Sequence, residues 1–231
     1  EELIFKFIPL REIVNVEWGL LNTTFNIISN YGALGAHIAQ GNGVIKIIEN
    51  KLSYQNEKLI RFSSNKESDD RLPNLNKFFF YNFHIKFTNS ISELINNKVF
   101  WTHTPDHTNF TENWDSWKKL WDNYHFLPIA FHIRDAIRHL ENDKDKRHDI
   151  FGRLGKGSKV FVSHGYKIDD KVLEVRIWGY SIKNEIKGCI KDEIENKLKE
   201  KLFSKAEYKC YLESCTLIEE KEGDKLLEEL T

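Results

Sequence analysis

The segment Lys77 to Phe87 reads KFFFYNFHIKF, and it constrains the fold of this chain more than any other stretch. Aromatic and β-branched residues of this kind are typical of β-strands. The aromatic residues are too dense for a strand with one face in water, because exposed rings lose the free energy that burial provides. We therefore expect a strand that is central in its sheet.

Composition restricts the class of protein. A chain of 231 residues can form one large domain or two small ones. No apolar run approaches the roughly 18 residues that a membrane span needs, so we expect a soluble globular protein. The three cysteines are odd in number and lack CxxC spacing, which favours a reducing cytoplasm. The net charge of -1 argues against nucleic-acid binding driven by bulk charge, so any anion site must be local.

The chain begins at Glu1 and contains no methionine. A translation start would supply one, so we expect this chain to be part of a longer protein. A second possibility is that methionines have been lost from the sequence, which an intact mass would reveal.

A polar stretch over residues 63–76 predicts the main domain boundary. We expect residues 1–62 to form the C-terminal part of a first domain and residues 63–231 to form a second domain with a helical C-terminal tail. In the first part, the pattern predicts a strand near 3–8, a helix from about Asn15 to Tyr31, and a strand at 44–48. The helix should bury one face, formed by Trp18, Leu21, Phe25 and Ile28.

After the central strand, apolar spacing predicts helices at about 90–98 and 114–124 and a third beginning at Pro128. Two apolar runs then form a hairpin that turns at Asp169-Asp170. A long amphipathic helix follows Asn184, and a short strand is possible near Tyr208. This order is close to the split βαβ pattern, so we expect an α+β fold of ferredoxin-like type, with an antiparallel sheet packed against helices.

The aromatic residues of segment 114–124 fall on one helical face and comprise Trp114, Trp117, Trp121 and Tyr124. Such a stripe belongs to a core or to a partner-protein contact more often than to a base-stacking platform. Arg134 and Arg138, four residues apart, share a face of the helix that begins at Pro128.

A glycine-rich segment, YGALGAHIAQGNG, connects the first helix to the strand that follows it. It is neither a Walker loop nor a Rossmann fingerprint, because no Gly-Lys-Ser/Thr follows and the order is helix to strand. Glycines let backbone N–H groups approach phosphate oxygens, so a nucleic-acid backbone is one possible ligand and a purely structural turn is the alternative. His37 within the segment could act as a general base on RNA, although no partner acid stands at motif spacing.

Other candidate chemistry is limited. His103, Asp106 and His107 are metal-type ligands, but no further ligands cluster with them, and we expect neither a metal nor another cofactor. We find no nucleophile signature and expect no enzyme activity. Three cations, Arg153, Lys156 and Lys159, alternate with glycines just before the hairpin. They suit phosphate contact, and a solvated approach to the hairpin is the alternative.

Three blocks combine into a family resemblance. They are IPLREI with EWGLLNTTFNIISNYGALGA and GNG, then LPIAFHIRDAIRHL, then FGRLGKGSKVFVSHGYKIDDKVLEVRIWGY. In this order they resemble the RAMP superfamily and, within it, the first Cmr subunit of type III-B CRISPR effector complexes. Family members have two ferredoxin-like, RRM-related domains. Because the N-terminal part of the family has no counterpart here, we expect the C-terminal part of the subunit.

The resemblance implies a non-catalytic subunit of an RNA-guided antiviral complex, which contributes to binding of the guide 3' end and of target RNA beside other Cmr subunits. The RNA-binding residues that the resemblance implies are Gly32, Gly35, His37, Gln40, Gly41, Gly43, Arg134, Arg138, Lys156, Lys159, His164 and Arg176, and Arg153 is added from its position among the glycines before the hairpin. Two alternatives stay open. One is a metal-independent RAMP endoribonuclease that uses His37, and the other is a pure protein-interaction module that docks through the aromatic stripe.

Overall fold

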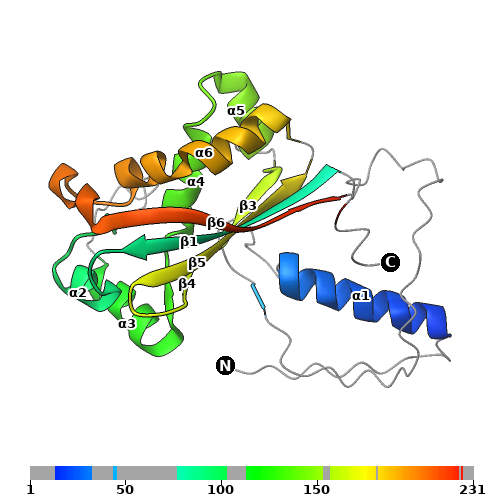
Figure 1. Cartoon of the computed structure of the whole chain (residues 1–231), viewed down its shortest axis with the longest axis horizontal. Coiled ribbons are helices and arrows are strands. Elements are labelled where there is room, and N and C mark those ends of the chain that lie inside the picture. Colours follow the sequence, from blue (N-terminus) through cyan, green and yellow to red (C-terminus); the bar gives the residue numbers. More distant parts are fainter. Residues whose placement is uncertain are drawn as a thin grey trace.

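Strand β1 (Phe78–Phe87) is the central strand of an antiparallel sheet (Figure 1). The computed structural model describes residues 14–32, 44–45, 77–102, 113–152, 157–180, 182–223 and 225. β1 pairs on one side with β5 (Val172–Tyr180) and on the other with β6 (Leu212–Glu222), both antiparallel. The prediction of a central strand is therefore confirmed.

The remaining described strands lie beyond β5. The sheet order is β2-β4-β5-β1-β6, with β3 also paired to β5. These short strands are β2 (Phe126–Leu127), β3 (Val160–Val162) and β4 (Gly165–Lys167). The predicted hairpin forms, but its first arm is interrupted at Ser163 and His164. There the Ser163 hydroxyl accepts a hydrogen bond from the Arg176 N–H at 2.8 Å, in place of a strand carbonyl.

Helices α4 (Ala130–Arg138), α5 (Lys144–Phe151) and α6 (Asn184–Lys201) lie on one side of the sheet, here called the inner face (Figure 1). Helices α2 (Ile91–Asn96) and α3 (Trp114–Tyr124) lie at one end of the sheet and add buried residues to the same hydrophobic core. Alternate residues of β1, from Phe79 to Phe87, pack against buried isoleucines and leucines of these helices. Each such side chain contributes about 1.5–3 kcal/mol through burial.

The opposite, outer face of the sheet is contacted by α1 (Asn15–Tyr31). Helix α1 ends at Tyr31, as predicted, and the Tyr31 ring meets Phe80 of β1 edge-on, with ring centroids 5.1 Å apart. The face that α1 buries differs from the prediction. The predicted apolar residues are only partly buried, whereas Thr23 and Ser29 are the buried residues of the helix among those described. The resulting structure is an α+β fold with an open antiparallel sheet and helices on both faces.

Two elements of the C-terminal half depart from the sequence prediction. Helix α5 was not predicted, and the strand expected near Tyr208 is a 3-10 helix (Ala206–Tyr211) that leads into the 11-residue strand β6. β6 is joined to α6 by ion pairs. The ammonium group of Lys187 lies 3.0 Å from the Glu222 carboxylate, and that of Lys191 lies 2.8 Å from Glu220. The charged tail is therefore part of the sheet.

Some of the predicted elements lie outside the described residues. These are the strands at 3–8 and 44–48 and the polar boundary at 63–76, of which only Val44 and Ile45 are described. The division into domains 1–62 and 63–231 remains a prediction. The stripe on α3 is largely internal, since Trp117 and Trp121 are buried and Tyr124 is 56% exposed. The two central rings of the stripe are therefore not accessible to a partner protein.

Candidate nucleic-acid interface

The glycine-rich segment begins against the outer face of the sheet. Gly32 directly follows α1, and its N–H donates a hydrogen bond to the Ile28 carbonyl at 3.1 Å. The other candidate residues of the segment lie outside the described residues: Gly35, His37, Gln40, Gly41 and Gly43. The start of the segment is thus placed beside β1 through the contact between Tyr31 and Phe80.

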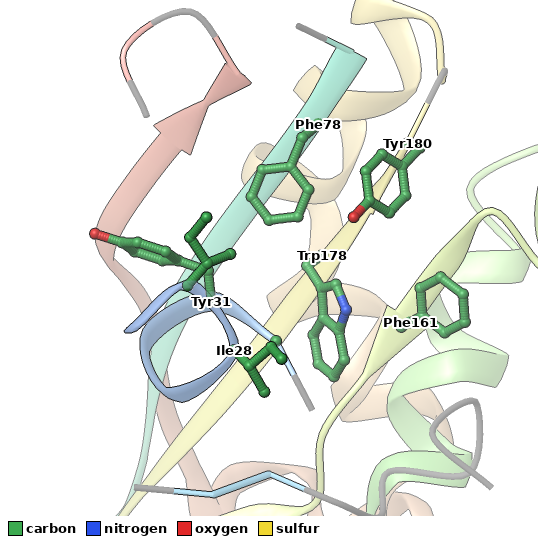
Figure 2. Close-up of a pocket in the computed structure, with 8 residues that line it drawn as sticks. Ile28, Tyr31, Phe78, Phe161, Trp178 and Tyr180 are labelled. Carbon is green, nitrogen blue, oxygen red and sulfur yellow. The ribbon is translucent and has the colours of Figure 1, made fainter. Parts of the chain in front are cut away.

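Gly32 also lines a pocket of about 240 Å³ between α1 and the outer face (Figure 2). We call this the aromatic pocket, and its lining is Ile27, Ile28, Tyr31, Gly32, Phe78, Phe161, Trp178 and Tyr180. Neighbouring strands supply the rings: Phe161 stacks on Trp178 at 6.0 Å, and Phe78 meets Tyr180 at 5.3 Å. These rings come together because cross-strand partners share one face of a sheet.

Arg176 of β5 connects this face to α1. Its Nη1 donates to the Ser29 carbonyl at 3.0 Å, and its Nε donates to Glu174 Oε1 at 3.0 Å. The side chain is only 16% exposed. A cation on a carbonyl of the last turn of a helix is favourable, because that end carries partial negative charge. Arg176, a predicted RNA-binding residue, thus has two of its donors engaged by the protein.

Three further predicted cations gather at the end of α5. Arg134 Nη2 donates to the Phe151 carbonyl at 2.9 Å, and Arg138 Nη1 donates to the Gly152 carbonyl at 3.4 Å. The ammonium group of Lys159 pairs with Asp149 at 2.7 Å. Gly152 has a φ of 77°, in the left-handed region where glycine is favoured, and it ends the helix.

We call Arg134, Arg138 and Lys159 the α4–α5 basic cluster. Burial, together with the neighbouring charge of Arg138, lowers the pKa of Arg134. The predicted residues Arg153 and Lys156 follow Gly152 in the sequence and lie outside the described residues. The cations from α4 therefore hold the C-terminal end of α5 at Phe151 and Gly152.

A strand joins the cluster to the aromatic pocket. Lys159 immediately precedes β3, and its carbonyl accepts a hydrogen bond from the Tyr180 N–H at 3.0 Å. Phe161, two residues later, lines the pocket. Lys159, whose ammonium group is paired with Asp149, is thus joined to the aromatic pocket by β3. Cations near aromatic rings suit contact with the phosphates and the bases of a single strand.

His164 has a different environment from the other candidates. Its Nδ1 accepts a hydrogen bond from the Ala130 N–H at 3.3 Å, at the first residue of α4, and its ring stacks on Phe126 at 5.3 Å. Burial lowers the pKa of His164 to about 4, so the ring is neutral at neutral pH. A neutral acceptor at this position caps the helix.

The bond from Arg134 to α5 leads to a prediction about stability. We expect Arg134→Ala to lower the free energy of unfolding by about 2 kcal/mol, because it leaves a carbonyl without a charged donor. Arg138→Ala should cost less, since its hydrogen bond is longer at 3.4 Å. Urea unfolding of both variants measures the difference. Equal stability of both variants and the parent would show that these contacts do not hold α5.

Within the described parts of the chain, no three His, Cys, Asp or Glu side chains gather as metal ligands would, and no helix is both long and apolar enough to cross a membrane. The segment with His103, Asp106 and His107 lies outside those parts. No model of a protein family, no curated protein and no solved structure matches this chain.

The sequence did not reveal the aromatic pocket. Its residues are spread from Ile27 to Tyr180, and they meet only through the pairing of β5 with β1 and β3. A partial signal was present, because Trp178 and Tyr180 alternate along the strand with the inward-facing Ile177.

Proposed function

We propose that this chain is a non-catalytic RNA-binding subunit of an RNA-guided type III-B CRISPR effector complex, which acts in the cytoplasm and contributes to binding of the guide 3' end and of target RNA. The observation that carries the proposal is that β3 joins Lys159 of the α4–α5 basic cluster to the aromatic pocket, close in sequence to the predicted cations Arg153 and Lys156. Cations and rings side by side form the usual combination for binding single-stranded nucleic acid.

The arrangement of strands supports the finer assignment of the fold. With β3 and β4 taken as one interrupted strand and the two-residue strand β2 set aside, the chain from β1 onward runs strand, helices, strand, strand, helix, strand. The first and third of these strands, β1 and β5, are adjacent, and the last, β6, pairs with the first. This is the strand order of the ferredoxin-like split βαβ unit. We propose that this part of the chain is a RAMP domain built on that unit.

RNA binding across a salt series tests this function. The probe is a labelled ten-nucleotide single-stranded RNA with chelator present, measured by fluorescence anisotropy. We expect affinity to fall steeply with salt, because binding at each phosphate releases counterions. Arg153→Ala with Lys156→Ala should weaken binding and reduce the salt slope by about 1.4, which is roughly 0.7 for each of the two cations removed from a single strand.

The matched control is Lys118→Ala with Lys119→Ala, which removes the same charge from exposed positions on α3. It should leave the affinity nearly unchanged. If the recovered RNA runs intact on a denaturing gel, the result agrees with a non-catalytic subunit. If the RNA is cleaved in the presence of chelator, and His37→Ala abolishes the cleavage, the protein is an endoribonuclease and the proposal is wrong. Absence of any RNA binding would contradict the function proposed.

A further inference from the structure

We propose that the aromatic pocket binds one unpaired RNA base. The inference rests on the RNA-binding function proposed above and identifies which part of the RNA binds to the outer face of the sheet. Phe78 and Trp178 are buried and form the floor of the pocket, whereas Tyr31, Phe161 and Tyr180 are partly exposed and form its rim (Figure 2). Strands β1 and β5 thus supply the floor, while α1, β3 and the end of β5 supply the rim.

The size of the pocket suits one ring system. At about 240 Å³ it is smaller than the roughly 300–1,000 Å³ that drug-sized ligands occupy, so it has no room for two stacked nucleotides. Its walls present ring faces and the methyl groups of two isoleucines. Every base has a planar π-face, so stacking on such walls is strong and tolerates any sequence.

Polar groups in the pocket could meet the edge of a base. Trp178 carries an indole N–H and Tyr180 a hydroxyl, and both residues line the pocket. Figure 2 shows the Tyr180 hydroxyl directed across the sheet toward Phe78 and Trp178. An indole N–H and a phenol hydroxyl can both donate hydrogen bonds, and a base edge supplies acceptors.

The surroundings favour RNA over another apolar ligand. A base in the pocket leaves its ribose and phosphates at the rim, where Gly32 begins the glycine-rich segment on one side. On the other side lies β3, with Phe161 at the rim and the cation Lys159 two residues before it. A base engaged in a duplex cannot enter such a pocket, because its faces are covered by neighbouring base pairs. Single-stranded RNA is therefore the ligand.

Two substitutions test the pocket in opposite physical ways. Ile28→Phe fills it with a larger side chain, and Phe161→Ala removes one wall. The control is Tyr124→Ala, which removes an exposed ring on α3 away from the pocket. The probe is a fluorescein-labelled single-stranded oligoadenylate of ten nucleotides, and the comparison is an RNA duplex of the same length. Urea unfolding of each variant verifies that it is folded.

We expect both pocket variants to weaken binding of the single strand roughly fivefold to a hundredfold, the range for removal of one stacked base, with an unchanged salt slope. The control should bind like the parent, and the duplex should bind at least tenfold more weakly than the single strand. A salt-dependent affinity that Ile28→Phe leaves unchanged would overturn the base pocket and leave the RNA-binding function standing. No binding of either RNA by the parent would overturn both proposals.

Discussion

Lowering the pH from 7 to 4 is expected to remove on the order of 6 kcal/mol from the free energy of unfolding, because two histidines are held neutral in the fold. Burial lowers the pKa of His132 from 6.5 to about 4. Hydrogen bonds to the Lys201 and Trp101 carbonyls and the charge of Asp135 raise the same pKa, but burial has the larger effect. Burial alone lowers the pKa of His164 to about 4.

The sign follows from proton binding. Each folded-state pKa lies below the unfolded value, so the unfolded chain binds protons first as the pH falls. The stabilising contribution is complete above pH 6.5 and is lost as the pH falls toward 4, by about 3 kcal/mol for each histidine. Carboxylates with a lowered pKa, such as Glu195, lose their contribution only at lower pH. The interval between pH 7 and 5 therefore reports the histidines.

Urea midpoints measured across this interval test the expectation. His164→Asn removes one titrating ring, so the dependence on pH should become shallower while stability at pH 7 falls. The control is His125→Asn, at an exposed position with a φ of 58° that asparagine tolerates, which makes the same chemical change and leaves His132 and His164 in place. A parent protein whose urea midpoint is the same at pH 7 and pH 5 would contradict the assignment.

Replacing Gly179 by alanine is expected to cost about 3 kcal/mol of folding free energy, at the upper end for overpacking of a core. A Cβ at this position would collide with the carbonyl oxygen of Lys159 and lie 2.9 Å from the Phe79 ring. That carbonyl accepts the hydrogen bond from the Tyr180 N–H, so relief of the collision would separate β3 from β5.

Gly188→Ala in α6 is the matched control. No atom lies within 4 Å of a Cβ built there, and alanine is favoured over glycine in a helix by up to about 1 kcal/mol. The same chemical change should therefore destabilise the protein at Gly179 and stabilise it at Gly188. Urea unfolding measures both effects, and a Gly179→Ala variant as stable as the parent would show that β3 does not pack as described.

Where one physical term dominates a segment, its structure could be predicted from the sequence. The aromatic density of residues 77–87 required burial and indicated the central strand, and the spacing of Ile186, Ile190, Ile194 and Leu198 indicated the buried face of α6. Helix α5 could not be found in this way, because its sequence KDKRHDIF has little apolar periodicity. It begins at the local Asp143 cap, and it depends on the burial of Ile150 and Phe151, which is a tertiary effect.

The candidate site could likewise be predicted only in part from the sequence. The clustering of Arg134 with Arg138 follows from their spacing on a helix, but their bonds to α5 depend on how α5 packs. Thr23 and Ser29 of α1 are buried, although the sequence pattern predicts that the apolar residues of the helix are the buried ones. For Ser29 the reason is visible: its carbonyl accepts the Arg176 hydrogen bond, and Arg176 lies more than a hundred residues away in the sequence. Single-segment patterns do not contain that information.

The ion pairs between α6 and β6 have a consequence for how the last strand finds its place. β6 alternates too weakly in hydrophobicity to select one alignment with β1, but sliding it by one residue would turn Glu220 and Glu222 away from α6. Lys221 would then face α6, opposite Lys187 or Lys191 depending on the direction of the shift, and at least one of the two ion pairs would be replaced by two like charges. Charge therefore helps to set the register of β6, because a shift by one residue in either direction places two lysines opposite each other.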